Sequence, residues 1–274
     1  CMHVLFKTKP LGGKMSNLPS DPTGKKLGLV IDLDICVGCH ACSVSCKEWN
    51  TGGHSGPLPD DDPFGKNATG VWFNRVHTFE CGDGVDGRTV HFPRSCLHCE
   101  NPACVEVCPT GASYKRAEDG IVLVNEEICI GCKLCSWACP YGAREYDYDA
   151  GVIKKCTLCI DRIYNKNLEE EDRVPTCVSS CPTNARHFGD LADPNSEVSR
   201  MVEERGGYDL IPELHYQPVN KYLPPRTKKV HTEPSKQDKS LISSTPKEKL
   251  PNGLFQWLDN ILSCLLYTSD AADE

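Results

Sequence analysis

The chain has 274 residues, of which 39% are hydrophobic and only 7% aromatic, so its apolar core is modest for its length. It contains 19 cysteines, and a chain of this kind needs cross-links or metal to hold it together. The formal net charge of −8 argues against a nucleic-acid partner, and the absence of a run of eighteen apolar residues predicts no membrane-spanning helix.

The two ends of the chain are expected not to belong to the fold. Met15 begins MSNLPSDPTGKK and suits a start site, which would make residues 1–14 a non-native leader. Residues 264–274 resemble the translation of a sequencing adapter. No secretory signal is visible, and the many free thiols suit a reducing compartment, so we expect the protein in the cytoplasm. Export of the folded chain with a partner would instead place it on the periplasmic side.

Short runs rich in Val and Ile recur along the chain, and each precedes a cluster of cysteines. These runs lie at 27–34, 88–92, 120–125 and 151–155. Their composition predicts strands, and turn residues at 118–120 and 149–151 predict hairpins. Residues 51–87 depart from this repeat: they begin with a stretch rich in Gly, Pro and Asp, which predicts an inserted loop, and 71–80 is predicted to be a strand returning from it.

Sixteen cysteines form four groups of four. The first group is Cys36, Cys39, Cys42 and Cys46. The second is Cys96, Cys99, Cys104 and Cys108, and the third is Cys129, Cys132, Cys135 and Cys139. The fourth is Cys156, Cys159, Cys177 and Cys181, with a long insertion in its middle. A disulfide framework gives no reason for such grouping.

The last cysteine of groups two, three and four begins a second repeat. Cys108, Cys139 and Cys181 are each followed by Pro, two further residues and Ala. The proline is expected to end a short helix and turn the chain into a strand. The predicted unit is therefore strand, cysteine loop, short helix and strand. Four units predict an α+β fold made of two dicluster ferredoxin-like modules.

The spacing of groups one and three is typical of 4Fe–4S clusters. A Cys-x-x-Cys-x-x-Cys loop supplies three thiolates to one cube, and the fourth cysteine, further along the chain, ligates the other cube in two-cluster ferredoxins. Gly38 and Gly131 are expected to relieve crowding where the loop backbone approaches the sulfurs. Zinc sites built from two Cys-x-x-Cys knuckles remain the alternative, which group four alone would satisfy.

Several other residues near the groups have two interpretations each. The side chains of Lys133, Arg144, Lys154 and Lys155 could favour a reduced cluster or simply belong to a solvated face. His40 and His98 could tune a cluster or make ordinary hydrogen bonds. We expect Trp49 and Trp137 to shield clusters from water, and Cys81 to be an ordinary thiol. No hydrolytic triad, dinucleotide-binding loop or phosphate loop is present, so no substrate is expected to react on this chain.

With all sixteen cysteines and three Cys-Pro repeats, residues 27–190 resemble the iron–sulfur subunit of the DMSO reductase family of molybdenum enzymes. Two stretches, LGLVIDLDICVGCHACSVSCKEWN and NRVHTFE, are most similar to its quinone-linked sulfite dehydrogenase branch. The resemblance implies a four-cluster domain over 15–190, with an outer module (27–50 with 150–190) and an inner module (88–148). Residues 191–263 would then be a C-terminal extension, in which 224–251 cannot fold alone and 254–262 suits a short amphipathic helix.

The resemblance also implies how four 4Fe–4S clusters are held. One cube would be bound by Cys36, Cys39, Cys42 and Cys181. Its neighbour would be bound by Cys46, Cys156, Cys159 and Cys177. A third would be bound by Cys96, Cys99, Cys104 and Cys139, and the fourth by Cys108, Cys129, Cys132 and Cys135.

The family further implies a non-catalytic electron-transfer role between two partners. These are a molybdopterin-containing catalytic subunit and an integral-membrane, quinone-reactive anchor, which would hold this chain on the inner face of the membrane during anaerobic or sulfur respiration. Two other functions remain open from the sequence. One is a free-standing polyferredoxin carrier, and the other is a zinc-binding interaction module.

Overall fold

The computed structural model describes residues 18–20, 22–51, 70–82 and 87–226. The expected leader (1–14), the adapter-like residues (264–274), the helix at 254–262 and most of the inserted loop lie outside them. None of the helices in the described ranges is long and apolar enough to cross a bilayer.

Strand β1 (Leu27–Asp32) is the centre of a three-stranded sheet. All six of its residues are buried, in keeping with its nearly continuous apolar sequence. Strand β8 (Arg186–Asp190) pairs with it antiparallel, with Leu27 opposite Asp190. Strand β9 (Lys221–Leu223) pairs with its other edge in parallel. The sheet therefore joins segments that are far apart in the chain, and it brings the first cysteine group next to the end of the fourth.

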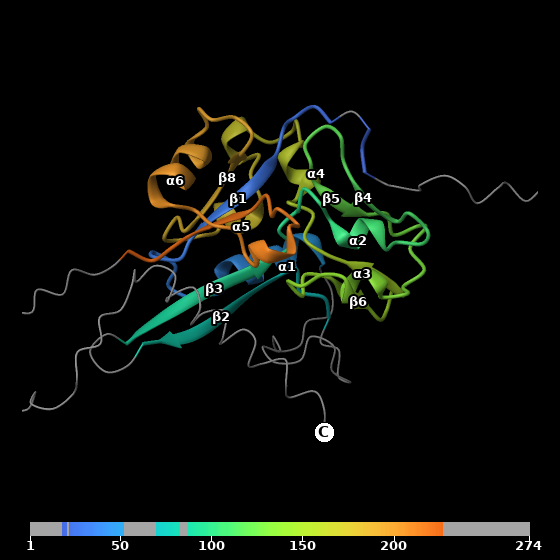
Figure 1. Cartoon of the computed structure of the whole chain (residues 1–274), viewed down its shortest axis with the longest axis horizontal. Coiled ribbons are helices and arrows are strands. Elements are labelled where there is room, and N and C mark those ends of the chain that lie inside the picture. Colours follow the sequence, from blue (N-terminus) through green and yellow to red (C-terminus); the bar gives the residue numbers. More distant parts are fainter. Residues whose placement is uncertain (1–17, 21, 52–69, 83–86, 227–274) are drawn as a thin grey trace, which may run out of the picture.

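Three antiparallel hairpins make up the remaining strands. Strands β2 (Asn74–Cys81) and β3 (Arg88–Ser95) form a long ribbon, which Figure 1 shows extending away from the body of the molecule. The pairs β4 (Ser113–Lys115) with β5 (Val122–Val124), and β6 (Glu145–Asp147) with β7 (Val152–Lys154), are short. Each of the expected strands is present, and Gly120 and Gly151 adopt positive φ in the two predicted turns.

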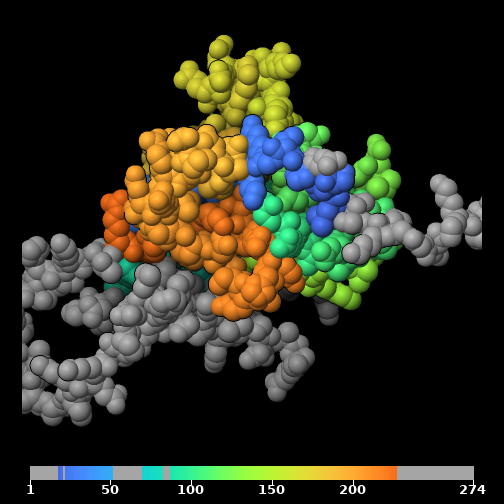
Figure 2. All heavy atoms as spheres, turned by 45° about the horizontal axis from the view of Figure 1, so that its top comes forward, coloured from blue at the N-terminus to red at the C-terminus, as the bar shows by residue number. Residues whose placement is uncertain are grey.

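The helices are mostly single turns beside cysteines. They are α1 (Ala41–Asn50), α2 (Ala103–Glu106), α3 (Leu134–Trp137), α4 (Ile160–Ile163) and α5 (Thr176–Ser179), with 3-10 turns η2 (Glu170–Asp172) and η3 (Pro212–Leu214). Helices this short are not stable alone, so packing and the cysteine loops must hold them. Figure 2 shows the insertion of the fourth group, which contains α4 and η2, projecting from the surface.

Residues 191–226 supply helix α6 (Glu197–Arg205) and strand β9 to the sheet, and the stretch between them bonds to the second cysteine group through Glu100 and Asn101. Helix α6 begins at Ser196, whose hydroxyl accepts a hydrogen bond from the amide of Ser199, and it ends at Gly206 in the left-handed conformation. Beyond it, the buried Asn220 accepts a hydrogen bond from the Leu29 amide at 2.8 Å and donates one to the Cys96 carbonyl at 2.9 Å. This one side chain thus connects β1 to the second cysteine group.

The larger of two apolar clusters in the described residues joins the parts of the molecule. It includes Leu29 and Ile31 of β1, Phe92 of β3, Leu158 of the fourth cysteine group and Tyr222 of β9. The rings of Phe92 and Tyr222 stack with their centroids 4.5 Å apart. Figure 1 shows β1, β8, α5 and α6 towards one end of the molecule and β4 to β6 with α2 and α3 towards the other.

Candidate metal centres

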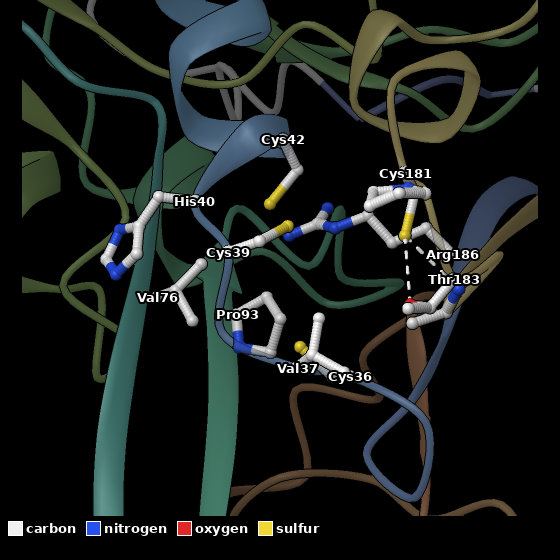
Figure 3. Close-up of a pocket in the computed structure, with 12 residues that line it drawn as sticks. Cys36, Val37, Cys39, His40, Cys42, Val76, Pro93, Cys181, Thr183 and Arg186 are labelled. Atoms are coloured by element: carbon white, nitrogen blue, oxygen red, sulfur yellow. Dashed lines mark hydrogen bonds between the residues drawn. The ribbon is translucent and has the colours of Figure 1, made fainter.

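The first quartet, Cys36, Cys39, Cys42 and Cys181, lines one pocket (Figure 3). Three of its thiols lie on the loop after β1 and the start of α1, and the fourth lies just before β8. The antiparallel pairing of β1 with β8 brings these segments together. Val37, Val76 and Pro93 supply apolar walls, and Arg186 also lines the pocket. Four thiols around one hollow match the donor set of a cube, so the residues fit a 4Fe–4S group.

The second quartet is Cys46, Cys156, Cys159 and Cys177, and all four side chains are buried. The pKa of Cys46 is raised well above its ordinary value, chiefly by burial and then by the three other thiols of the quartet. The Asn50 amide nitrogen lies 3.5 Å from Sγ of both Cys46 and Cys159, and it can donate to either. Sulfur atoms from two distant segments of the chain thus share one donor.

The third quartet is Cys96, Cys99, Cys104 and Cys139. Burial raises the pKa of Cys99, and nearby Cys96, Cys104 and Cys139 raise it further. In the fourth quartet, Cys108, Cys129, Cys132 and Cys135, the Cys108 and Cys135 thiols are also electrostatic neighbours. Cys129 and Cys132 occupy the same loop as Cys135, and the Ile153 amide donates to Cys129 Sγ at 3.5 Å.

The four quartets follow one another in a line. The pKa of Cys177 is raised to about 11 by burial, then by Cys159 and by Cys42 of the first quartet, although Arg186 opposes the shift. Cys156 of the second quartet has Cys96 of the third as a neighbour. Cys135 of the fourth has Cys104 of the third. Only Cys39 and Cys132 among the described cysteines are exposed, and they belong to the first and fourth quartets. The line therefore reaches solvent at both ends.

The four cysteine loops share one backbone conformation. The residue two positions after the first cysteine of each group is left-handed: Gly38 (φ 66), His98 (φ 48), Gly131 (φ 64) and Leu158 (φ 54). The crowding at the two glycines comes from other groups than the expected sulfurs: a Cβ on Gly38 would collide with the His91 ring and one on Gly131 with the Gly151 carbonyl. His98 and Leu158, both fully buried, hold this conformation without being glycine.

The Cys-Pro repeats form amide cradles around their sulfurs. Cys108 Sγ accepts a hydrogen bond from the Ser113 amide at 3.4 Å, and Cys181 Sγ accepts one from the Ala185 amide at 3.2 Å. The amides of Tyr141 and Ala143 do the same for Cys139. Burial opposes ionisation of Cys108, but hydrogen bonds from Ser113 and Thr110 outweigh it and lower its pKa. Such N–H donors stabilise negative charge on a ligating sulfur.

The arrangement suits clusters better than single ions. No three His, Cys, Asp or Glu side chains in the described ranges converge closely enough for one metal ion. In a cube each thiolate binds a separate iron atom, so the sulfurs stand further apart than the ligands of one zinc ion. Because burial raises the pKa of eight of these sixteen thiols, metal binding would release their protons.

Some expectations about neighbouring residues were wrong. Trp137 is 80% exposed and Trp49 is 42% exposed, so neither is a buried shield. The interpretation of Arg144 and Lys155 as a solvated face also fails, because their exposed fractions are 1% and 3%. Lys133 lies over the Tyr146 ring, and Lys154 forms an ion pair with Asp147 at 2.8 Å.

Three further side chains have clear places in the structure. His98 is buried and accepts a hydrogen bond from the Val122 amide, while His40 lines the first pocket. Cys81 lies in the apolar core. Sequence reasoning missed Asn50 and Arg186. Arg186 could have been found, because it occupies the same position after a Cys-Pro repeat as Arg144.

Comparison with known proteins indicates the same kind of cofactor. Residues 88–191 match the family described as a 4Fe-4S dicluster domain. The chain is 62% identical over 209 residues to the B subunit of the sulfite dehydrogenase of Allochromatium vinosum, covering 76% of this chain and 87% of that relative. It is 36% identical to the iron-sulfur B subunit of a putative dimethyl sulfoxide reductase of Halobacterium salinarum, covering 72% and 78%. It is 35% identical to the B polypeptide of the anaerobic dimethyl sulfoxide reductase of Escherichia coli K12, covering 72% and 88%.

Proposed function

Because the protein belongs to the family of iron–sulfur subunits that includes those of sulfite dehydrogenase and dimethyl sulfoxide reductase, we propose that it conducts electrons through four 4Fe–4S clusters. Bound clusters would supply one-electron transfer, and the protein would hold, insulate and order them. The linear order of the four quartets is the observation that carries this proposal.

Each quartet would hold one cluster with the ligands named above. The first and second quartets would form the outer module with residues 27–50 and 150–190, and the third and fourth the inner module with 88–148. Contacts between α1 and α5 and the pairing of β1 with β8 support the outer module. The boundary at residue 190 and the extension to 263 stay predictions.

The two exposed ends of the line would be the electron ports. Cys39 and Cys132 are accessible, and exposed apolar side chains accompany each: Val37 and Val44 at the first quartet, and Ile130, Leu134 and Trp137 at the fourth. Apolar surface of this kind suits protein contacts. One port would meet a molybdopterin-containing catalytic subunit and the other a quinone-linked membrane anchor, which would hold the chain at the inner face of the membrane.

Sulfite oxidation is the reaction we propose for the complex, since 62% identity joins this chain to a sulfite dehydrogenase subunit. The chain itself would turn over no substrate. The free-standing carrier is less favoured because several of the relatives it matches are named as subunits or chains of reductases and dehydrogenases. The zinc module is disfavoured by the spread of the thiols in the described ranges.

Counting metal and sulfide tests the proposal. Anaerobically purified full-length chain should contain about sixteen iron atoms and as many acid-labile sulfides, four of each per cluster. Zinc in place of iron, or a count near eight irons, would refute the four-cluster assignment. Co-purification with a molybdenum-containing polypeptide distinguishes the subunit from the free carrier.

A further inference from the structure

Two buried arginines occupy the same place in two Cys-Pro repeats. The sequences CPYGAR and CPTNAR put Arg144 and Arg186 five residues after Cys139 and Cys181. In the third repeat, CPTGAS, Ser113 stands at this position instead. The exposed fractions of Arg144 and Arg186 are 1% and 3%. A repeated position with a fully charged side chain inside the protein calls for a partner of opposite charge.

Arg144 lies where the third quartet meets the fourth. Its Nη2 atom donates to Cys104 Sγ of the third quartet at 2.9 Å and to the Ser113 hydroxyl at 2.7 Å. Cys135 of the fourth quartet is also an electrostatic neighbour of this guanidinium. One guanidinium therefore lies beside sulfur ligands of both proposed clusters.

Arg186 has the same relation to the first and second quartets. Cys177 of the second quartet is its strongest electrostatic neighbour among the thiols, and Cys42 of the first quartet is the next. Its Nη2 atom donates to Asn74 Oδ1 at 2.6 Å, which fixes its orientation. Figure 3 shows its side chain reaching into the pocket that the first quartet lines.

Neither guanidinium is satisfied by protein groups alone. In the described part of the chain, no carboxylate forms an ion pair with either arginine. The Nε and Nη1 atoms of both are buried without a hydrogen-bond partner there. A buried charge with unpaired donors is costly unless a counter-charge completes it. The sulfurs of an anionic cluster on each side would provide that charge and accept those hydrogen bonds.

We propose that Arg144 and Arg186 are shared counter-cations, each placed between two clusters of one module and raising the reduction potential of both. This rests on the proposed four-cluster occupancy. A fixed positive charge stabilises the added electron of a reduced cluster, and the effect is strong because the site is dry. The same charge screens repulsion between two neighbouring reduced clusters. Lys155, buried beside Cys156 and Cys104, holds the corresponding place between the second and third quartets.

The test is an EPR-monitored redox titration of the complete complex, with iron and sulfide counted in each preparation. Arg144→Gln should lower the midpoint potentials of two clusters and leave two unchanged, and Arg186→Gln should lower those of the other two. Arg144→Lys and Arg186→Lys keep the charge, so their midpoint potentials should lie close to those of the wild type. Lys154→Gln is the control: it removes a cation that already pairs with Asp147, and it should move no potential.

The outcomes separate this inference from the four-cluster proposal. Wild-type protein with fewer than four clusters would refute the proposed function, whatever the variants do. With four clusters present, unchanged potentials in both Gln variants, or equal shifts of all four clusters, would overturn the role of the arginines. If a Gln variant loses iron, the Lys variant at the same position decides between the two roles. Full iron and near-wild-type potentials in the Lys variant support the counter-cation. Equal loss of iron in both variants means that the arginine acts through packing, and overturns the counter-cation role.

Discussion

Gly131 lies so close to the carbonyl oxygen of Gly151 that a Cβ atom on Gly131 could not be accommodated. Through this contact the loop of the third cysteine group packs against the turn of the β6–β7 hairpin. Both glycines have positive φ, 64° and 70°, and this backbone conformation also favours glycine at each position. The hairpin therefore determines how this loop presents its thiols.

Gly131→Ala should cost the protein one cluster. The methyl group would meet a backbone atom that cannot rotate away, and the left-handed φ adds about 1–2 kcal/mol of strain. We expect loss of about a quarter of the iron, measured after anaerobic purification. Gly24→Ala is the matched control, because Gly24 also has positive φ (83°) but nothing lies within 4 Å of its Cβ position. Full iron in Gly131→Ala would show that the loop does not depend on this contact.

Asn50→Leu should lower the potential of the cluster held by the second quartet. The substitution removes an N–H donor placed 3.5 Å from both Cys46 and Cys159 sulfurs. Losing a hydrogen bond worth about 1 kcal/mol in the reduced state corresponds to about 40 mV for one electron. Redox titration of the variant measures the shift. Asn101→Leu, which removes an exposed amide bonded to the His215 carbonyl, should leave all potentials in place.

The sequence predicted the local structure well because its signals are local. The strands at 27–34, 120–125 and 151–155 follow from Val and Ile runs with turn residues beside them, and the single-turn helices follow from the Cys-Pro repeats. The pairing of β1 with β9 did not follow, since a three-residue strand after residue 220 carries almost no pattern of its own. Its place depends on Asn220 and Tyr222, whose partners lie far away in the chain.

The side-chain environment was harder to predict than the ligands. Cysteine spacing identifies the candidate ligands directly, but the burial of other side chains depends on how the elements pack. Trp137 was therefore expected to be buried beside a cluster, and it is exposed to solvent. Arg144 was singled out, but a solvated face stayed open as one of its two interpretations, because a charged residue usually faces solvent. Asn50 belongs to no sequence motif. It can donate to two sulfurs only because α1 packs beside the fourth cysteine group.

Paired cysteine substitutions should reveal the crossed ligation. Cys36→Ala and Cys181→Ala lie far apart in the chain, but both line one pocket, so they should abolish the same EPR signal. Cys46→Ala and Cys177→Ala should abolish a different one, because both belong to the buried second quartet. Cys81→Ala is the control and should keep all four signals, since Cys81 lies in the apolar core outside the quartets. If Cys36→Ala and Cys46→Ala instead removed the same signal, each group would bind its own cluster.

A buried carboxyl gives the fold a pH dependence of its own. Glu145 accepts a hydrogen bond from the Trp72 amide at 2.7 Å and pairs with Arg75 at 2.6 Å. Burial raises its pKa from 4.5 to about 7, although Arg75, Trp72 and Lys47 oppose the shift. Between these pH values the folded state binds more protons than the unfolded state, so this group makes stability fall as pH rises.

Glu145→Gln should remove that slope, because glutamine resembles the protonated acid at every pH. From about pH 5 to about pH 8 the variant should gain about 2.5 kcal/mol relative to wild type, most of the free energy that the pKa shift represents. Guanidinium-induced loss of the visible cluster absorbance, followed anaerobically across this range, measures the difference. Glu80→Gln removes an exposed carboxylate of β2, and its stability should depend on pH in the same way as that of the wild type. A variant that instead loses stability relative to wild type as pH rises would mean that the Arg75 ion pair outweighs burial, and that the carboxyl is held ionised.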